Sequence, residues 1–144
     1  FIVDPYQITE AKAYGADVIL LIAAVLDRKE IEQFSILAQE LGMEVLLEVH
    51  NQEEVDKSIM PSLNMIGVNN RNLKTFKVNL ETSIMLSTLI PDEFVKISES
   101  GIRSVEDIKS LQPYGYKGFL IGENFMITEN PGTAAADFIK LLNA

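Results

Sequence analysis

Short apolar runs alternate along the chain with longer segments that mix apolar and polar residues. The apolar runs are rich in Val, Ile and Leu, and five of them predict strands: residues 17–25, 44–49, 65–68, 94–98 and 117–121. Residues 1–3 are interpreted as the end of a further strand. Strands that alternate with amphipathic helices are typical of consecutive βα units, in which the strands form a parallel sheet.

Signals for helix ends agree with this division. Proline follows Asp4 and Asn130, an arrangement that favours a helix start, and Asn79 is expected to open a helix that runs to about residue 89. Three further pairs have the spacing of a capping box or a close relative of one: Asp27 with Glu30, Asn51 with Glu54, and Ser104 with Asp107. Glycines that can end a helix with a positive φ stand before three predicted strands: Gly15, Gly42 and Gly115.

The fold class that follows is α/β, with a parallel sheet covered by helices. The strands are almost continuously apolar, as expected when helices cover a parallel sheet, and no Pro/Gly/Ser-rich linker divides residues 1–144. We therefore predict one domain. Because a complete (β/α)8 TIM barrel needs roughly 250 residues, the chain is expected to supply about the last five βα units of an incomplete barrel.

Charge and composition narrow the partners. The chain has 21 acidic and 12 basic residues and a formal net charge of -9, which disfavours nucleic acid but leaves a phosphorylated small molecule possible, because backbone amides can bind phosphate. There is no cysteine, which excludes disulfides and thiolate metal sites and is compatible with the cytoplasm. The longest apolar run, residues 18–26, is about half of a bilayer span, so no membrane span is expected. No metal-ligand cluster or signal peptide is visible in the sequence either.

Two carboxylates are placed where the chemistry of parallel βα proteins gathers, at the carboxyl ends of strands. Glu48 and Glu99 each end an apolar run, where burial and neighbours can shift a pKa far enough for acid/base work. Each carboxylate could instead cap the following helix or pair with Arg71.

Polar residues also follow the third predicted strand. Asn69 is a candidate to hold a carboxylate or a substrate hydroxyl, and Arg71 a candidate clamp for a carboxylate or phosphate. Asn70 and Asn72 fit loop-stabilising roles equally well. His50, the single histidine, fits a solvated or locally hydrogen-bonded side chain better than a catalyst.

Glycines follow the last two predicted strands, in Ser100-Gly101 and Gly122-Glu123. In this fold the corresponding loops commonly form a phosphate site from backbone amides, because glycine permits close approach. Two such turns in adjacent units favour a phosphate site, although both could be simple turns between strand and helix.

The strand-end sequences Leu-Leu-Glu-Val, Gly-Val-Asn-Asn-Arg-Asn-Leu, Ile-Ser-Glu-Ser-Gly-Ile and Gly-Phe-Leu-Ile-Gly resemble those of the indole-3-glycerol phosphate synthase family. The opening Phe-Ile-Val-Asp-Pro-Tyr-Gln-Ile resembles the family's segment after its third strand, so the resemblance covers essentially the whole chain. It implies ring closure of 1-(2-carboxyphenylamino)-1-deoxyribulose 5-phosphate to indole-3-glycerol phosphate in tryptophan biosynthesis, with loss of carbon dioxide and water and without a cofactor.

The resemblance also implies residue roles. Glu48 matches the acid/base glutamate of the dehydration step, and Glu99 matches the carboxylate that stabilises positive charge in the intermediate. The remaining matches concern binding: Asn69 hydrogen-bonds in the same site, Arg71 and Ser100 contact substrate, and Gly101 and Gly122 bind phosphate through the backbone. Glu123 stands where many relatives carry a small hydroxyl residue, so we expect its side chain to turn away and its amide alone to serve the phosphate.

The family's first-strand glutamate and lysine, and its general-acid lysine just before the segment that matches Phe1, have no counterpart in these residues. We therefore expect little activity from the chain alone, and a partner that completes the sheet, either the N-terminal barrel segment or a second copy. Two alternatives stay open: a noncatalytic half-barrel that serves folding or assembly, and another phosphate-binding barrel enzyme.

Overall fold

A computed structural model describes residues 1–143. Five parallel strands form one sheet in chain order: β1 (Val18–Ile22), β2 (Glu44–Val49), β3 (Met65–Asn69), β4 (Val95–Glu99) and β5 (Tyr116–Leu120). The helices are α1 (Pro5–Ala13), α2 (Arg28–Glu40), α3 (Gln52–Ser58), α4 (Glu81–Ser87), α5 (Val105–Leu111), α6 (Glu123–Met126) and α7 (Pro131–Leu142), with a 3-10 turn η1 (Gln112–Tyr114) before β5. None of the helices in the described part of the chain is long and apolar enough to cross a membrane.

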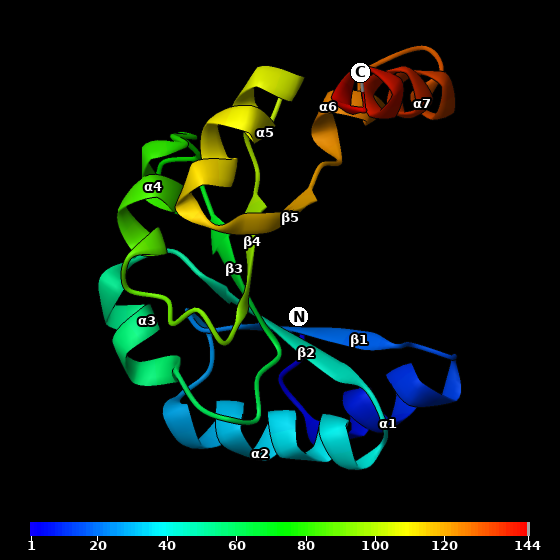
Figure 1. Cartoon of the computed structure of the whole chain (residues 1–144). Coiled ribbons are helices and arrows are strands. Elements are labelled where there is room, and N and C mark those ends of the chain that lie inside the picture. The colour runs from blue at the N-terminus through cyan, green and yellow to red at the C-terminus, as the bar shows by residue number, and fades with distance from the viewer. Residues whose placement is uncertain (144) are drawn as a thin grey trace.

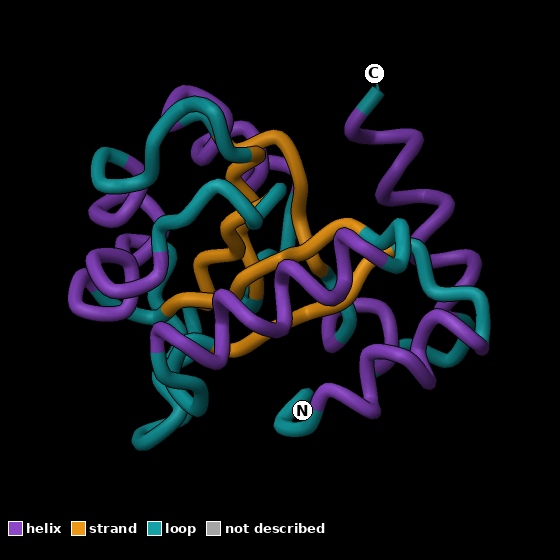
Figure 2. Tube along the Cα trace, turned by 90° about the horizontal axis from the view of Figure 1, so that it is seen from below, coloured by secondary structure: helices purple, strands orange, loops and turns teal. Residues whose placement is uncertain are grey.

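The sheet is curved, with α2, α3, α4 and α5 along its convex side (Figure 1). Seen from below, the strands lie in the middle and the helices surround them (Figure 2). The α1 and α7 ends of this arc face each other across an opening (Figure 1). A curved parallel sheet with its helices outside is an arc of a (β/α)8 barrel, so the predicted fold class is confirmed.

The two faces of the sheet have different environments. Alternate strand residues such as Ile19, Leu21, Val45 and Leu47 point toward the helices and belong to the main apolar core. Their neighbours in sequence point to the concave face, because successive side chains of a strand alternate. The concave face corresponds to the interior of the barrel.

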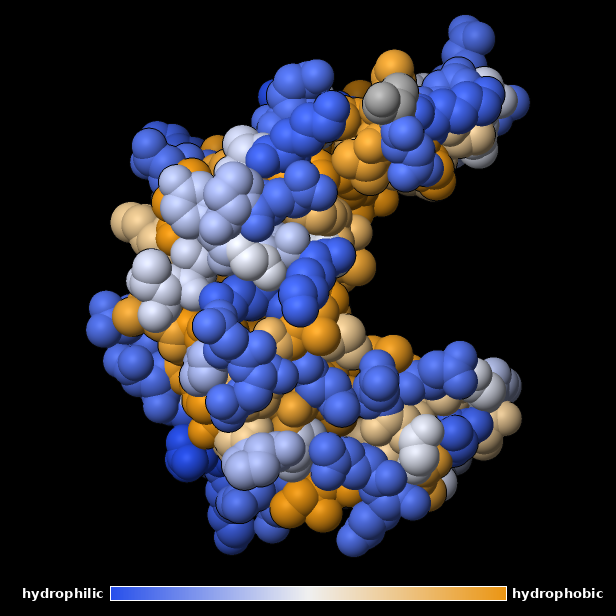
Figure 3. Space-filling model, in the orientation of Figure 1, coloured by the Kyte–Doolittle hydropathy of each residue, from blue (hydrophilic) through white to orange (hydrophobic). Residues whose placement is uncertain are grey.

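Apolar side chains on the concave face remain accessible near the two sheet edges. Val18 on β1 is 43% exposed, Val95 on β4 is 39% exposed and Leu120 on β5 is 44% exposed. Figure 3 shows apolar surface bordering the opening between the two arms of the arc. Both β1 and β5 are edge strands, which leaves their outer backbone groups without a neighbouring strand in the sheet.

The predicted helix ends agree well with the structure. Asp27 with Glu30 and Ser104 with Asp107 form reciprocal capping boxes, and Asp4 forms one with Gln7. The three glycines predicted to end helices have positive φ: Gly15 (87°), Gly42 (73°) and Gly115 (87°). Local sequence therefore determines where these helices begin and end.

Some predicted strand boundaries are wrong. The first strand ends at Ile22 rather than at residue 25, because the N–H of Val25 donates to the carbonyl of Ile22 and closes a turn. Residues 1–3 form no strand; the N–H of Val3 donates instead to the side chain of Gln7 at 2.7 Å. The fourth strand begins and ends one residue later than predicted, and the fifth one residue earlier.

Helix α4 is also shorter than expected, since it spans Glu81–Ser87 instead of residues 79–89. Asn79 still contributes to its start, because its side chain accepts a hydrogen bond from the N–H of Glu81 at 3.0 Å. The carbonyl of Asn79 also accepts the N–H of Thr82 at 3.2 Å.

Candidate active site

The carboxyl ends of β2, β3 and β4 bring three predicted site residues to one rim. Asn69 on β3 is the register partner of Glu99 on β4, and Glu48 on β2 pairs with Gly67 on β3. All of them occupy positions of the concave face. Both carboxyl residues are buried: Glu48 is 8% exposed and Glu99 is 5% exposed. The predicted convergence of these side chains is confirmed.

Glu48 lies in an environment that favours its ionised form. Its Oε1 atom is 3.2 Å from Nε2 of His50. Burial opposes ionisation, but His50, Asn69 and Glu99 stabilise the carboxylate and lower its pKa below the usual 4.5. Glu48 is therefore a carboxylate at neutral pH, ready to accept a proton.

Glu99 lies in the opposite environment. Burial raises the pKa of Glu99 to about 8, and the neighbouring negative charge of Glu48 adds to this effect. Its Oε1 atom is buried and has no hydrogen-bond partner among the described residues. At neutral pH Glu99 consequently holds a proton, so the two carboxyl groups differ in protonation state at the same rim.

Gly67 makes room for this arrangement. A Cβ atom at position 67 would lie 2.0 Å from Oε1 of Glu99 and 3.1 Å from Cδ1 of Leu46. The carboxyl group of Glu99 thus extends over the backbone of β3, toward Glu48. A glycine inside a strand pattern can signal such a close approach, but nothing in the sequence shows which side chain makes it.

Asn69 and Arg71 lie beside this carboxyl pair at the start of the loop after β3. The N–H of Arg71 donates to Oδ1 of Asn69 at 2.9 Å, which orients the amide side chain. The guanidinium of Arg71 forms an ion pair with the carboxylate of Glu123, which begins α6. The expectation that the Glu123 side chain turns away from the site is therefore wrong, because the positive charge of Arg71 attracts its carboxylate. The sequence left open that Glu48 and Glu99 each cap the following helix or pair with Arg71. In the structure neither residue does so.

The two glycine turns meet at a second, smaller cavity. Ser100 and Gly101 have φ values of 65° and 78°. A Cβ at position 101 would lie 2.2 Å from Cγ1 of Val78, so both backbone angle and space require glycine there. The cavity has a volume of about 90 Å³, and Arg71, Ser100–Ile102 and Leu120–Asn124 line it. Gly122 and Glu123 therefore face the same space as Ser100 and Gly101.

A larger cavity of about 540 Å³ adjoins the rim between the loops that follow β2 and β3. Its lining includes His50, Glu54, Asn69 and Arg71, together with Lys74 and Lys77 from the β3–α4 loop. Anionic and polar groups of a ligand would meet positive side chains on the loop side. The described residues contain no group of three or more His, Asp or Glu side chains that could hold a metal ion.

Asn70 has a structural role that the sequence left undecided. It is 2% exposed, and its Nδ2 atom donates to Oγ of Ser98 at 2.9 Å and to the carbonyl oxygens of Glu99 and Ser100 at 3.0 and 3.1 Å. Its Oδ1 atom accepts from the N–H and the hydroxyl of Ser83. Asn70 thus stabilises the backbone that carries Glu99 and the first glycine turn.

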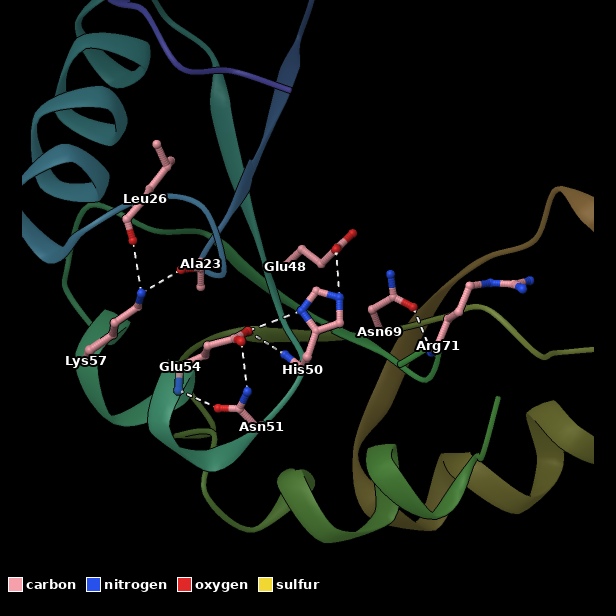
Figure 4. Close-up of polar contacts among 9 residues, drawn as sticks. All are labelled: Ala23, Leu26, Glu48, His50, Asn51, Glu54, Lys57, Asn69 and Arg71. Atoms are coloured by element: carbon pink, nitrogen blue, oxygen red, sulfur yellow. Dashed lines mark hydrogen bonds and ion pairs between the residues drawn. The ribbon is translucent and has the colours of Figure 1, made fainter. Parts of the chain in front are cut away.

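His50 is a locally hydrogen-bonded side chain rather than a solvated one. Its ring lies between Glu48 and Glu54, with Nδ1 3.2 Å from Oε2 of Glu54 (Figure 4). In the same region the ammonium group of Lys57 donates to the carbonyls of Ala23 and Leu26 at 2.6 and 2.9 Å (Figure 4). Lys57 thereby ties the loop after β1 to helix α3.

The fold and the site define a (β/α)8-barrel protein with a buried, unequal carboxyl pair at the rim where barrel chemistry is located. A sequence model of the indole-3-glycerol phosphate synthase family matches residues 1–138, and the chain belongs to that family.

Curated relatives agree with this assignment. The indole-3-glycerol phosphate synthase of Chromobacterium violaceum is 50% identical over 134 residues, which are 93% of this chain and 51% of the relative. That of Bacteroides thetaiotaomicron is 46% identical over 142 residues, which are 99% of this chain and 54% of the relative. The chain thus spans about half the length of the curated relatives it matches.

Solved structures show the same fold at much lower sequence identity. The 3-hexulose-6-phosphate synthase of Salmonella typhimurium has a TM-score of 0.78 and 16% identity, over 96% of this chain and 67% of that chain. A mutant tryptophan synthase alpha-subunit of Pyrococcus furiosus has a TM-score of 0.69 and 18% identity, over 97% of this chain and 60% of that chain. These similarities support the barrel fold alone.

Proposed function

We propose that the protein that contains this chain is an indole-3-glycerol phosphate synthase, a carbon-carbon lyase of tryptophan biosynthesis in the cytoplasm. Its substrate would be 1-(2-carboxyphenylamino)-1-deoxyribulose 5-phosphate, which closes to indole-3-glycerol phosphate as carbon dioxide and water leave. This chain supplies one part of the catalytic rim, and we do not expect turnover from it alone.

The observation that supports this proposal most directly is the unequal carboxyl pair. Loss of water requires one group that takes up a proton and one that delivers it. Glu48, which is ionised at neutral pH, suits the acid/base role in dehydration. Glu99 suits the stabilisation of positive charge, since a cation that forms beside it would lower its pKa and favour its carboxylate form.

The residues around the pair suit the two ends of the substrate. The side chain of Asn69, oriented by the backbone of Arg71, can hydrogen-bond the substrate beside Glu48. Ser100, Gly101, Gly122 and the amide of Glu123 border the small cavity, where backbone N–H groups can bind the phosphate. Arg71 lines both cavities and can hold an anionic group of the substrate once Glu123 releases it.

We further propose that additional strands complete the barrel against β1 and β5. The exposed concave-face residues Val18 and Leu120 lie on these edge strands and would be covered by such neighbours. The strands could come from the N-terminal part of the protein or from a second copy of this chain. Measurement of the molecular mass in solution separates the two sources, and a stable 16.1 kDa monomer of this chain would contradict both.

The test of the proposed function uses the full-length protein and follows formation of the indole ring by its fluorescence. Glu99→Gln keeps the shape of the side chain but removes its ability to become negatively charged. We expect kcat to fall by about 10²-fold or more, with a smaller relative effect on the urea midpoint of unfolding.

Glu93→Gln is the matched control, because Glu93 is an exposed carboxylate in the loop before β4. It should leave kcat unchanged. The proposal fails if the full-length protein does not form the indole product, and Glu99 is structural if its variant loses stability and activity in parallel.

A further inference from the structure

The side chain of His50 stands between two carboxylates at the rim. Nε2 is 3.2 Å from Oε1 of Glu48 and Nδ1 is 3.2 Å from Oε2 of Glu54, and the three side chains are 10–13% exposed. Figure 4 shows the ring between the two acidic side chains, with Glu48 on the side of the rim and Glu54 on helix α3. Both ring nitrogens thus have an acidic neighbour.

Glu54 is held rigidly, which fixes the ring in turn. Its Oε2 atom accepts the backbone N–H of His50 at 2.8 Å, and its Oε1 atom accepts Nδ2 of Asn51 at 2.8 Å. The N–H of Glu54 donates to Oδ1 of Asn51 at 2.9 Å. In a capping box this carboxylate would bind the N–H of the capping residue Asn51. Here it binds the N–H one residue earlier, which brings it beside the ring of His50.

We propose that His50, clamped by Glu54, is a positioning residue that holds the Glu48 carboxylate opposite Glu99. This inference rests on the proposed function, because it assigns His50 a task within the same site. His50 does not need to touch substrate for this task, since it acts through Glu48.

The charges around the ring support this assignment. Nδ1 is hydrogen-bonded to Glu54, and Nε2 faces Glu48 at ion-pair distance without the geometry of a hydrogen bond. Two carboxylates beside one buried ring favour its charged form, which carries a proton on each nitrogen. Burial opposes this charge, but Glu48 and Glu54 outweigh it and raise the pKa of His50 to about 9. Glu99 lies beyond Glu48 and is neutral until the pH passes its pKa of about 8, so it does not add negative charge at neutral pH. The positive Arg71, Lys74 and Lys77 also line the 540 Å³ cavity and oppose a charge on the ring.

The contact gives the two carboxyl groups different partners. Glu48 has the protonated ring of His50 at 3.2 Å, while the buried Oε1 of Glu99 has no partner among residues 1–143. At neutral pH the pair therefore holds one proton, which resides on Glu99, and one negative charge, which resides on Glu48. Without His50 both groups would be buried carboxyls of similar environment, and Glu48 would retain its proton to a higher pH.

The test uses the full-length protein with histidine rings labelled with ¹⁵N. The signal that is absent from the His50→Gln spectrum identifies His50. We expect this ring to titrate near pH 9 in the unmodified protein and at clearly lower pH in Glu54→Gln and in Glu48→Gln. A ring that titrates near its ordinary pH of 6.5, without response to Glu48→Gln, would overturn the proposal.

The kinetic arm separates positioning from a merely structural effect. His50→Gln should move the acidic limb of the kcat profile to higher pH by about one unit, and Glu54→Gln should move it in the same direction by less. A uniform loss of kcat without movement of the limb would also refute the proposal. If the ring titrates as expected but neither the unmodified protein nor any variant forms the indole product, the proposed function fails, whereas the arrangement of His50 between Glu48 and Glu54 stands.

Discussion

Substitution of Gly67 by alanine tests whether the close approach of Glu99 to Glu48 matters for activity. The new Cβ would lie 2.0 Å from Oε1 of Glu99, whereas ordinary contact begins at 3.4 Å. The carboxylate oxygen must therefore move by about 1.4 Å, because the strand backbone on the other side of the contact is held by its neighbours β2 and β4. φ at position 67 is not positive, so alanine meets no backbone strain there.

The expected loss of activity is large and the expected loss of stability small. A displacement of about 1 Å in a catalytic constellation can reduce the rate by about 10²-fold, so we expect kcat of Gly67→Ala to fall by about that factor. Crowding of the interior costs about 1–3 kcal/mol. Replacement of a strand glycine offsets about 0.5–1 kcal/mol of this, so the net destabilisation should be about 2.5 kcal/mol or less.

Turnover by indole fluorescence and unfolding in urea, both on the full-length protein, measure the two effects. Gly118→Ala is the matched control, because Gly118 is a strand glycine on β5 whose Cβ would approach only the side chain of Ile97, at 3.2 Å. It should affect kcat much less. Normal turnover by Gly67→Ala, or an equal loss in both variants, would refute the idea that the position of Glu99 over Gly67 is what the reaction requires.

Two further predictions concern charge. Glu123→Ser frees Arg71 from an exposed ion pair, so KM should fall by up to about fivefold, while the exposed Glu129→Ser should leave KM unchanged. The second prediction concerns pH. Burial raises the pKa of Glu99 from 4.5 to about 8. Burial alone would lower the pKa of His50, but Glu48 and Glu54 outweigh it and raise this pKa from 6.5 to about 9. The folded chain then binds more protons than the unfolded chain, so the free energy of unfolding should fall as pH rises from 6.5 to 9, and urea midpoints that rise across this window would contradict it.

Much of the fold follows from local sequence. The alternation of apolar runs and capped amphipathic segments identified all five strands, and the residues at Asp27, Ser104 and Gly42 act as predicted because capping depends on neighbours in the chain. The end of β1 was misplaced, since Ala23–Val25 is as apolar as the strand. Only the hydrogen bond from the N–H of Val25 to the carbonyl of Ile22 distinguishes these three residues from the strand. A pattern of apolar residues does not predict that hydrogen bond.

The site divides in the same way. The sequence by itself determined that Glu48, Asn69 and Glu99 lie at one rim, because parallel strands bring their carboxyl ends to the same edge of a sheet. The tertiary structure alone decided their partners: His50 beside Glu48, Gly67 beneath Glu99, and Glu123 against Arg71. Some of these contacts join residues of different elements, and others are set by the direction that a side chain takes across a neighbouring strand. A change of about one ångström in strand register or sheet curvature would alter them. Strand pattern places a residue on a face and at an edge, but only packing in three dimensions determines which charges meet there and therefore which carboxyl group holds the proton.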